Sequence, residues 1–158
     1  MVSLLALFMG GVAGLRAMMA PALVTWAAAL GWLDLSGSWL SFLASKWAVL
    51  IFTILAVFEL VTDQLPNTPS RKVPQQFITR LITGGVAGAA IGIPYDLWLA
   101  GLVSGVLGAV AGTYGGAWAR AKLAEIFGKD APAAFIEDGV AFVVAFIIIL
   151  SLPAAATI

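Results

Sequence analysis

Long apolar stretches alternate with short polar segments along the whole chain. A helix needs about 20 predominantly apolar residues, with a range of roughly 17 to 25, to cross the hydrocarbon core of a bilayer. Five stretches approach or exceed that length, at residues 3–33, 45–65, 77–93, 97–119 and 133–152. The pattern predicts an all-α fold: a polytopic bundle of about five transmembrane helices, forming one integral membrane domain over residues 1–158.

The first stretch is too long for one straight span and too short for two full ones. Arg16 and Pro21 interrupt it, and a proline inside a helix removes a hydrogen bond and kinks the chain. The element is therefore either a long kinked helix or a short broken hairpin. We favour the kinked helix, because membrane helices tolerate proline well. No basic residue precedes its apolar run, so we interpret it as the first span rather than as a signal peptide.

The composition indicates that the outer surface of this bundle faces lipid. Hydrophobic residues make up 62% of the chain and charged residues only 10%, whereas a soluble domain carries about 25% charged residues. The net charge is zero, without the basic excess typical of a protein that binds nucleic acid. Cysteine and histidine are absent, which removes the thiolate and imidazole ligands of most metal sites. We expect no metal site and no cofactor.

The distribution of basic residues predicts the orientation in the membrane. With five spans, the connections at 64–76 and 120–132 lie on the same side, and with their flanks they carry six basic residues against one on the other side. The six are Arg71, Lys72, Arg80, Arg120, Lys122 and Lys129, and the one is Lys46. Because loops rich in Lys and Arg stay in the cytoplasm, this side is predicted to be cytoplasmic. The N-terminus is then cytoplasmic and the C-terminus lies outside.

Glycines recur at four-residue spacing, which places them on one face of each helix. Such faces let helix backbones approach closely in a membrane, within one protomer or between two. The glycines expected to pack helices are Gly10, Gly14, Gly84, Gly88, Gly92, Gly108, Gly112 and Gly116. Near copies of Gly-Gly-Val-Ala-Gly begin at Gly10, Gly84 and Gly108, which suggests an internal repeat. Pairing spans one and two with spans four and five would make this an inverted repeat, as in many transporters.

Charged residues inside the spans are the candidates for chemistry, because each costs about 2.5 to 3.5 kcal/mol on insertion scales. Glu59 and Asp63 end the second span, and Glu137 and Asp138 begin the fifth. Arg16 lies deep in the first span. Together with Arg71 and Arg80, these residues predict a polar site that faces the cytoplasm and binds an ion or a small solute. The alternative is that they anchor span ends by pairing across helices, and we expect an Arg16–Glu59 pair.

Two segments resemble a known family: Glu59-Leu-Val-Thr-Asp63-Gln-Leu-Pro66, and Glu137-Asp138-Gly-Val-Ala141 at the opening of the last span. With Arg80 and the glycine-rich span between them, they resemble the small bacterial membrane proteins catalogued as domain of unknown function 4126. The resemblance covers most of the chain. It implies a multi-span protein of the bacterial inner membrane and brings no particular activity.

Three functions fit these observations. The first is a small transporter or channel that works as a homodimer, because five spans enclose a pore poorly and the glycine faces offer an interface. The second is a non-catalytic scaffold or lipid-binding protein. The third is an enzyme that acts on a lipid headgroup through a magnesium ion held by carboxylates. We favour transport, with Glu59 and Asp63 binding the ion and Arg16 as the counter-charge.

Overall fold

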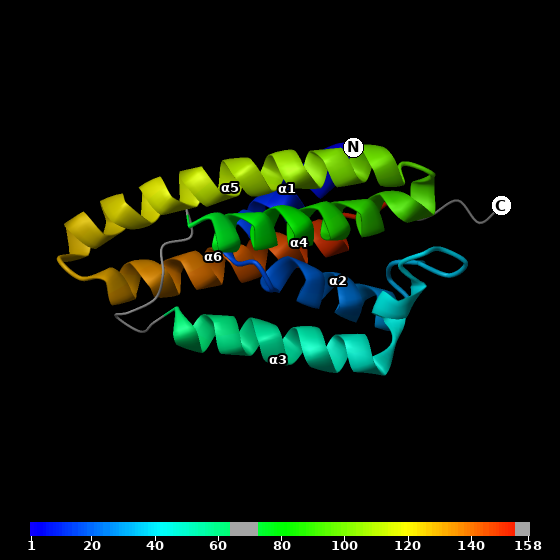
Figure 1. Ribbon diagram of the computed structural model, residues 1–158, viewed down its shortest axis with the longest axis horizontal. Helices are drawn as coiled ribbons and strands as arrows, with labels where there is room; N and C mark the ends of the chain where they lie inside the picture. Colours follow the sequence, from blue (N-terminus) through cyan, green and yellow to red (C-terminus); the bar gives the residue numbers. More distant parts are fainter. Residues whose placement is uncertain (64–72, 154–158) are drawn as a thin grey trace.

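The computed structural model describes residues 1–63 and 73–153, and all regular secondary structure within them is helical (Figure 1). The helices are α1 (Val2–Leu15), α2 (Met19–Ala29), η1 (Ser41–Ala44), α3 (Lys46–Thr62), α4 (Pro74–Gly92), η2 (Ile93–Tyr95), α5 (Trp98–Phe127) and α6 (Asp130–Leu150). Three of the described helices, α4 with η2, α5 and α6, are long and apolar enough to cross a membrane. The predicted all-α membrane bundle is confirmed, and each of the four later apolar stretches overlaps one long helix.

The first apolar stretch is broken into two helices. α1 ends at Leu15, Arg16 is extended with φ −137° and ψ 108°, and α2 begins at Met19. Pro21 lies in the first turn of α2, where a missing N–H leaves no helical hydrogen bond unmade, so it does not cause the break. At a rise of about 1.5 Å per residue, these helices of 14 and 11 residues are too short to cross the hydrocarbon core. Of the two alternatives, the broken hairpin is correct and the favoured kinked helix is wrong.

The two short helices run in opposite directions. α1 runs parallel to α5, because Gly10 packs against Gly105 and Gly14 against Ala109. α2 runs antiparallel to α3, because the N–H of Ala17 lies at Glu59 while Trp26 lies at Thr53. The α1–α2 pair is therefore a hairpin that enters and leaves the bundle at the same end (Figure 1). Its tip is the break at Arg16, between α1 and α2.

This hairpin removes the basis for the expected side of the N-terminus. The prediction of a cytoplasmic N-terminus counted residues 3–33 as one crossing of the membrane. In the structure, the start of α1 lies near the start of α5, at the end of the bundle opposite the 120–132 connection. The parity count is therefore wrong for the first element. If the 120–132 connection is cytoplasmic, α1 begins on the outer side.

Glycines allow α1, α4 and α5 to pack with their backbones almost in contact. A Cβ atom added to Gly10 would lie 2.0 Å from the carbonyl oxygen of Gly105, and one on Gly108 would lie 1.9 Å from that of Leu7. Between α4 and α5, a Cβ on Gly88 would lie 2.3 Å from the oxygen of Gly101. The same holds for Gly14, Gly92 and Gly112, while Gly84 is closest to the Cβ of Ala109 and Gly116 is buried on α5. No side chain fits at most of these positions, so the glycine faces act within one protomer.

The three glycine-rich near copies meet at this one junction of α1, α4 and α5. The expected inverted repeat required the first and fourth spans to run in opposite directions. In the structure α1 and α5 run in the same direction, since the first stretch turns back at Arg16. The shared motif is explained by backbone packing, and the inverted pairing of α1 with α5 is not present.

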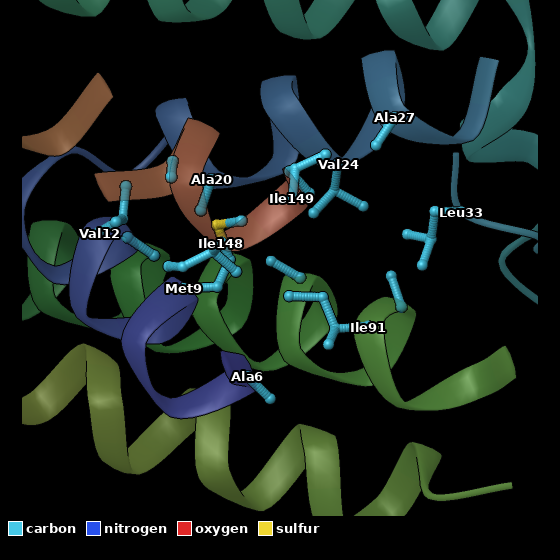
Figure 2. Close-up of a cluster of buried hydrophobic side chains, with 14 of the residues drawn as sticks. Ala6, Met9, Val12, Ala20, Val24, Ala27, Leu33, Ile91, Ile148 and Ile149 are labelled. Carbon is cyan, nitrogen blue, oxygen red and sulfur yellow. The ribbon is translucent and has the colours of Figure 1, made fainter. Parts of the chain in front are cut away.

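Large apolar side chains cover the outside of the bundle. Trp47 and Phe58 on α3 are each 64% exposed and Trp118 on α5 is 68% exposed. The interior is filled by smaller residues from α1, α2, α4 and α6, several of which Figure 2 shows in contact. Since an exposed surface of this kind is unfavourable in water, its solvent is lipid.

Candidate charged site at the hairpin tip

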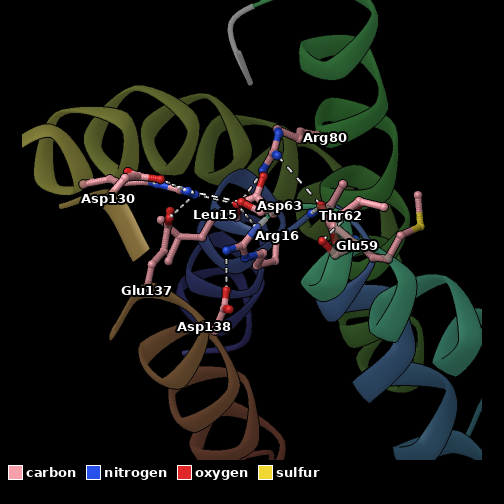
Figure 3. Close-up of polar contacts among 12 residues, drawn as sticks. Leu15, Arg16, Glu59, Thr62, Asp63, Arg80, Asp130, Glu137 and Asp138 are labelled. Carbon is pink, nitrogen blue, oxygen red and sulfur yellow. Dashed lines mark hydrogen bonds and ion pairs between the residues drawn. The ribbon is translucent and has the colours of Figure 1, made fainter. Parts of the chain in front are cut away.

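Arg16 is fully buried at the tip of the α1–α2 hairpin. It follows the last residue of α1, and its relative exposure is 0%. Its guanidinium forms ion pairs with Asp63, which follows α3, and with Asp138 of α6 (Figure 3). None of its three side-chain nitrogens makes an aligned hydrogen bond with a described residue. Arg16 is thus held by charge, between two carboxylates from different helices.

Glu59 binds the backbone of the hairpin tip. Its carboxylate oxygens accept hydrogen bonds of 2.8 Å from the N–H groups of Ala17 and Met18, directly before α2 begins. These N–H groups have no partner within a helix, and a carboxylate is favoured at the positive end of the helix dipole. The expected Arg16–Glu59 pair is therefore wrong. Glu59 contacts the two residues after Arg16 instead, since the extended backbone turns the arginine toward Asp63 and Asp138.

Arg80 binds the backbone at the end of α1, as Glu59 does at the start of α2. From α4, its guanidinium donates hydrogen bonds to the carbonyl oxygens of Gly14 and Leu15, at 2.8 and 2.7 Å. These carbonyls belong to the last turn of α1, where no helical N–H can reach them. Arg80 also lies 3.8 Å from Glu59. Backbone groups on both sides of the break are therefore hydrogen-bonded. The carboxylate of Glu59 accepts from the N–H groups after the break, and the guanidinium of Arg80 donates to the carbonyl groups before it.

Arg120 links the remaining carboxylates, and the sequence prediction did not include it in the site. It donates hydrogen bonds to Asp63 at 2.5 Å and to Asp130 at 2.9 and 2.6 Å, with a longer one of 3.4 Å to Glu137. A signal was available in the sequence. Only Gly128 and Lys129 separate α5 from α6, and so short a connection places residues equally far from it, such as Arg120 and Glu137, side by side.

The charged residues form two groups with different tasks. The first group, Glu59 and Arg80, forms hydrogen bonds with the backbone on either side of the break. The second is a chain of ion pairs that runs across three helices and the hairpin tip; its members are Asp138, Arg16, Asp63, Arg120, Glu137 and Asp130. Among the described residues, the ion pairs of the second group join two arginines with four carboxylates. Within the described residues, six of the seven predicted site residues come together here, and the seventh, Arg71, lies outside those residues.

A family model described as "Domain of unknown function (DUF4126)" matches residues 4–158. The chain belongs to the DUF4126 family. No curated protein and no solved structure matches it.

In this DUF4126 protein, the two segments that carried the resemblance supply opposite sides of the same site. The first provides Glu59 and Asp63, and the second provides Glu137 and Asp138. The acidic residues Asp34 and Asp96 lie at the other end of the bundle. Hydrogen bonds from the hydroxyl and the N–H of Ser36 hold the pKa of the exposed Asp34 below its usual value. Neither residue contributes to the charged site of the DUF4126 fold.

Two of the hollows beside the described helices of the DUF4126 bundle involve the hairpin. One, of about 110 Å³, lies between the end of α1, α5 and α6, and Arg120 and Glu137 are among its lining residues. The other is an apolar groove of about 280 Å³ between α2 and α6, lined by residues that include Trp26, Trp32 and Phe146. Among the described residues, no group of three or more carboxylates is placed to hold a metal ion.

Proposed function

We propose that the protein is a small inner-membrane transporter or channel for an ion or small solute, with the charged site facing the cytoplasm. The observation that carries this proposal is Arg16, fully buried at the tip of a hairpin of two short helices and paired with two carboxylates. Transporter sites are commonly built where membrane helices are broken, near residues that coordinate ions.

The division of tasks within the site supports this proposal. Glu59 and Arg80 satisfy backbone groups that lipid could not satisfy, so their presence is explained by structure alone. The Arg16–Asp138 pair instead joins two charged side chains, one of them fully buried. A well-packed apolar replacement for a buried ion pair is often as stable or more stable, and so fold stability alone does not account for these two residues.

The experiment is flux through the purified protein in liposomes, measured for protons with an enclosed pH-sensitive dye and for metal cations with ion-sensitive dyes. Asp138→Asn removes one charge from the Arg16 pair while keeping the shape of the side chain. The matched control is Glu125→Gln, because Glu125 is exposed on α5 and pairs with Lys122, which is also exposed. We expect Asp138→Asn to lower flux at least about tenfold, equivalent to about 1.4 kcal/mol, and the control to leave it unchanged.

Two results would contradict the proposal. One is wild-type flux no greater than that of protein-free liposomes, and the other is equal flux through Asp138→Asn and Glu125→Gln. Glu59→Gln, the obvious choice from the sequence, is a weaker test. It would weaken the hydrogen bonds that hold the hairpin tip, and flux would then fall for a structural reason.

Lipid binding is the second candidate, and the apolar groove between α2 and α6 favours it. Native mass spectrometry tests it: a lipid that survives detergent exchange and is lost in Phe146→Ala would support a lipid-binding protein. The magnesium-dependent enzyme rests only on the Glu59 to Asp63 spacing. We also retain the homodimer as a proposal, because a bundle with only three long membrane-crossing helices among its described residues encloses a pore poorly.

A further inference from the structure

The apolar groove of about 280 Å³ lies between two helices that run in the same direction, α2 and α6. Both run opposite to the parallel pair α1 and α5 (Figure 1). The lining residues on α2 are Leu23, Trp26, Ala27 and Leu30. Those on α6 are Phe142, Phe146 and Ile149. A spacing of three or four residues places each set on one face of its helix. The groove is therefore straight and about 10 Å long, because each set spans about two helical turns.

The groove runs along the half of the bundle farther from the charged site. Leu23 lies about one turn after the start of α2, which is where the backbone bonds to Glu59 are made. The other end of the groove is Trp32, at the same end of the bundle as Trp39 and Trp98, whose rings contact each other edge to face. Tryptophan is enriched at the membrane interface. The groove thus extends from that interface over about two-thirds of one leaflet's hydrocarbon, which is about 15 Å deep.

The side chains large enough to fill the groove are bound to neighbours on either side of it. The indole N–H of Trp26 donates a hydrogen bond of 3.0 Å to the hydroxyl of Thr53 on α3. Phe142 and Phe146 stack on each other, with ring centroids 6.3 Å apart and ring planes 4° apart. Between these aromatic walls, Ala27 is too short to fill the space. The groove therefore stays open in the packed arrangement of the described helices.

We propose that this groove binds one acyl chain of a phospholipid from the leaflet farther from the charged site. The inference goes beyond transport and does not depend on it. A buried water needs two to four polar partners, whereas this lining is apolar and the indole N–H of Trp26 already bonds to Thr53. An acyl chain lies parallel to the helices and contacts protein on three sides of the groove, so it gains dispersion contacts that an empty groove would lose. The described lining residues carry no charge, so the site recognises the chain rather than the headgroup.

The experiment is photo-crosslinking in vesicles of phosphatidylethanolamine and phosphatidylglycerol. The probe is a phosphatidylcholine with a diazirine in the middle of one acyl chain, and mass spectrometry locates its adducts. The reference is the lipid-facing side of α3 at Leu50, which is 50% exposed, against 53% for Leu30 in the groove. The two leucines lie at similar depth, because the Trp26–Thr53 bond sets the register of the antiparallel helices. We expect at least about threefold more adduct in the groove, where the chain has protein on three sides. Equal labelling of both places would indicate ordinary boundary lipid and overturn the site.

Two matched variants test the groove itself. Leu30→Trp enlarges a side chain that lines the groove, and Leu50→Trp makes the same change on α3. We expect Leu30→Trp to lower the adduct on α6 at least about threefold, because the bulkier ring takes the space of the chain, and Leu50→Trp to leave it unchanged. An unchanged α6 adduct in Leu30→Trp, with a wild-type unfolding midpoint, would overturn the site. A wild-type groove without adduct, beside a labelled α3, would show that protein covers it, such as a second copy of the chain, and would also overturn the proposal.

Discussion

Replacing Gly105 by alanine should destabilise the bundle, while the same change at Gly115 on the same helix should not. An alanine Cβ at Gly105 would lie 2.1 Å from the carbonyl oxygen of Gly84 and 3.1 Å from the Cα of Gly88. Comfortable contact needs about 3.4 Å, so α4 and α5 would have to separate locally by about 1 Å. Nothing lies within 4 Å of the corresponding position on Gly115.

Two opposing contributions to the free energy of unfolding can be compared: overpacking between the helices and the helix propensity of alanine. Overpacking against a well-packed interior costs about 1–3 kcal/mol, and a backbone atom cannot move aside as a side chain can, so we take the upper end. Alanine returns up to about 1 kcal/mol through its better helix propensity. We therefore expect Gly105→Ala to lose about 2 kcal/mol. Gly115→Ala keeps only the second term and should be neutral or more stable by up to about 1 kcal/mol.

The assay is reversible unfolding in mixed micelles of a mild detergent and sodium dodecyl sulfate, followed by helical circular dichroism and tryptophan fluorescence. Wild type, Gly105→Ala and Gly115→Ala are titrated in parallel. Equal midpoints for the two alanine variants would show that the close approach of α4 to α5 does not exist. They would also refute backbone packing as the reason for the glycine-rich motifs.

Three further predictions concern the hairpin, its side of the membrane and the oligomer. Glu59→Leu should cost about 2–6 kcal/mol in the same assay, because two N–H groups lose their acceptor at about 1–3 kcal/mol each. A cost no greater than that of Glu125→Gln would contradict the role of Glu59 in binding the hairpin tip. Ser3→Cys and Ser36→Cys should be labelled by an impermeant thiol reagent from one side and Ala121→Cys from the other, and a different pairing would contradict the hairpin. Light scattering in detergent should give twice the 16.4 kDa of one chain, and a monomer would remove the proposed dimer.

The sequence predicts the long helices well, because hydropathy measures the apolar character that a helix needs for contact with lipid. The stretch at 45–65 contains α3 at Lys46–Thr62, and that at 133–152 overlaps α6 at Asp130–Leu150. The stretch at 97–119 ends eight residues before α5 does. Hydropathy marks where lipid contact ends, while the helix continues until Gly128, whose φ of 65° terminates it.

The hairpin could not be predicted in the same way. A kinked helix and a broken hairpin bury the same apolar residues in the same lipid, so hydropathy does not distinguish them. Proline is the usual cause of irregularity in a helix, but Pro21 fits the first turn of α2 and the break falls at Arg16. The deciding information is the presence of Glu59 and Arg80 on other helices, which satisfy the freed backbone groups.

The sequence predicts the location of the site but not its pairs. Basic and acidic residues near span ends on one side are expected to gather, and they do. Choosing the partner of Arg16 requires the rotation of α3 about its axis, which sequence spacing does not give, and so Glu59 was the wrong choice. The contact between Arg120 and Glu137 could have been predicted from the sequence. The connection between α5 and α6 has only two residues, and these two side chains lie equally far from it along their helices.

The break in the first stretch determines which residues can be informative about function. A helix interrupted inside a membrane exposes N–H and carbonyl groups that must be satisfied by protein, and Glu59 and Arg80 do this at distances of 2.7 to 2.8 Å. Any substitution there disturbs the hairpin first, so loss of flux would say little about mechanism. Asp138 and Glu137 pair with arginine side chains instead, and their amide variants keep the side-chain shape. A change in flux at these two positions, with unfolding midpoints unchanged, would therefore report on the movement of charge itself.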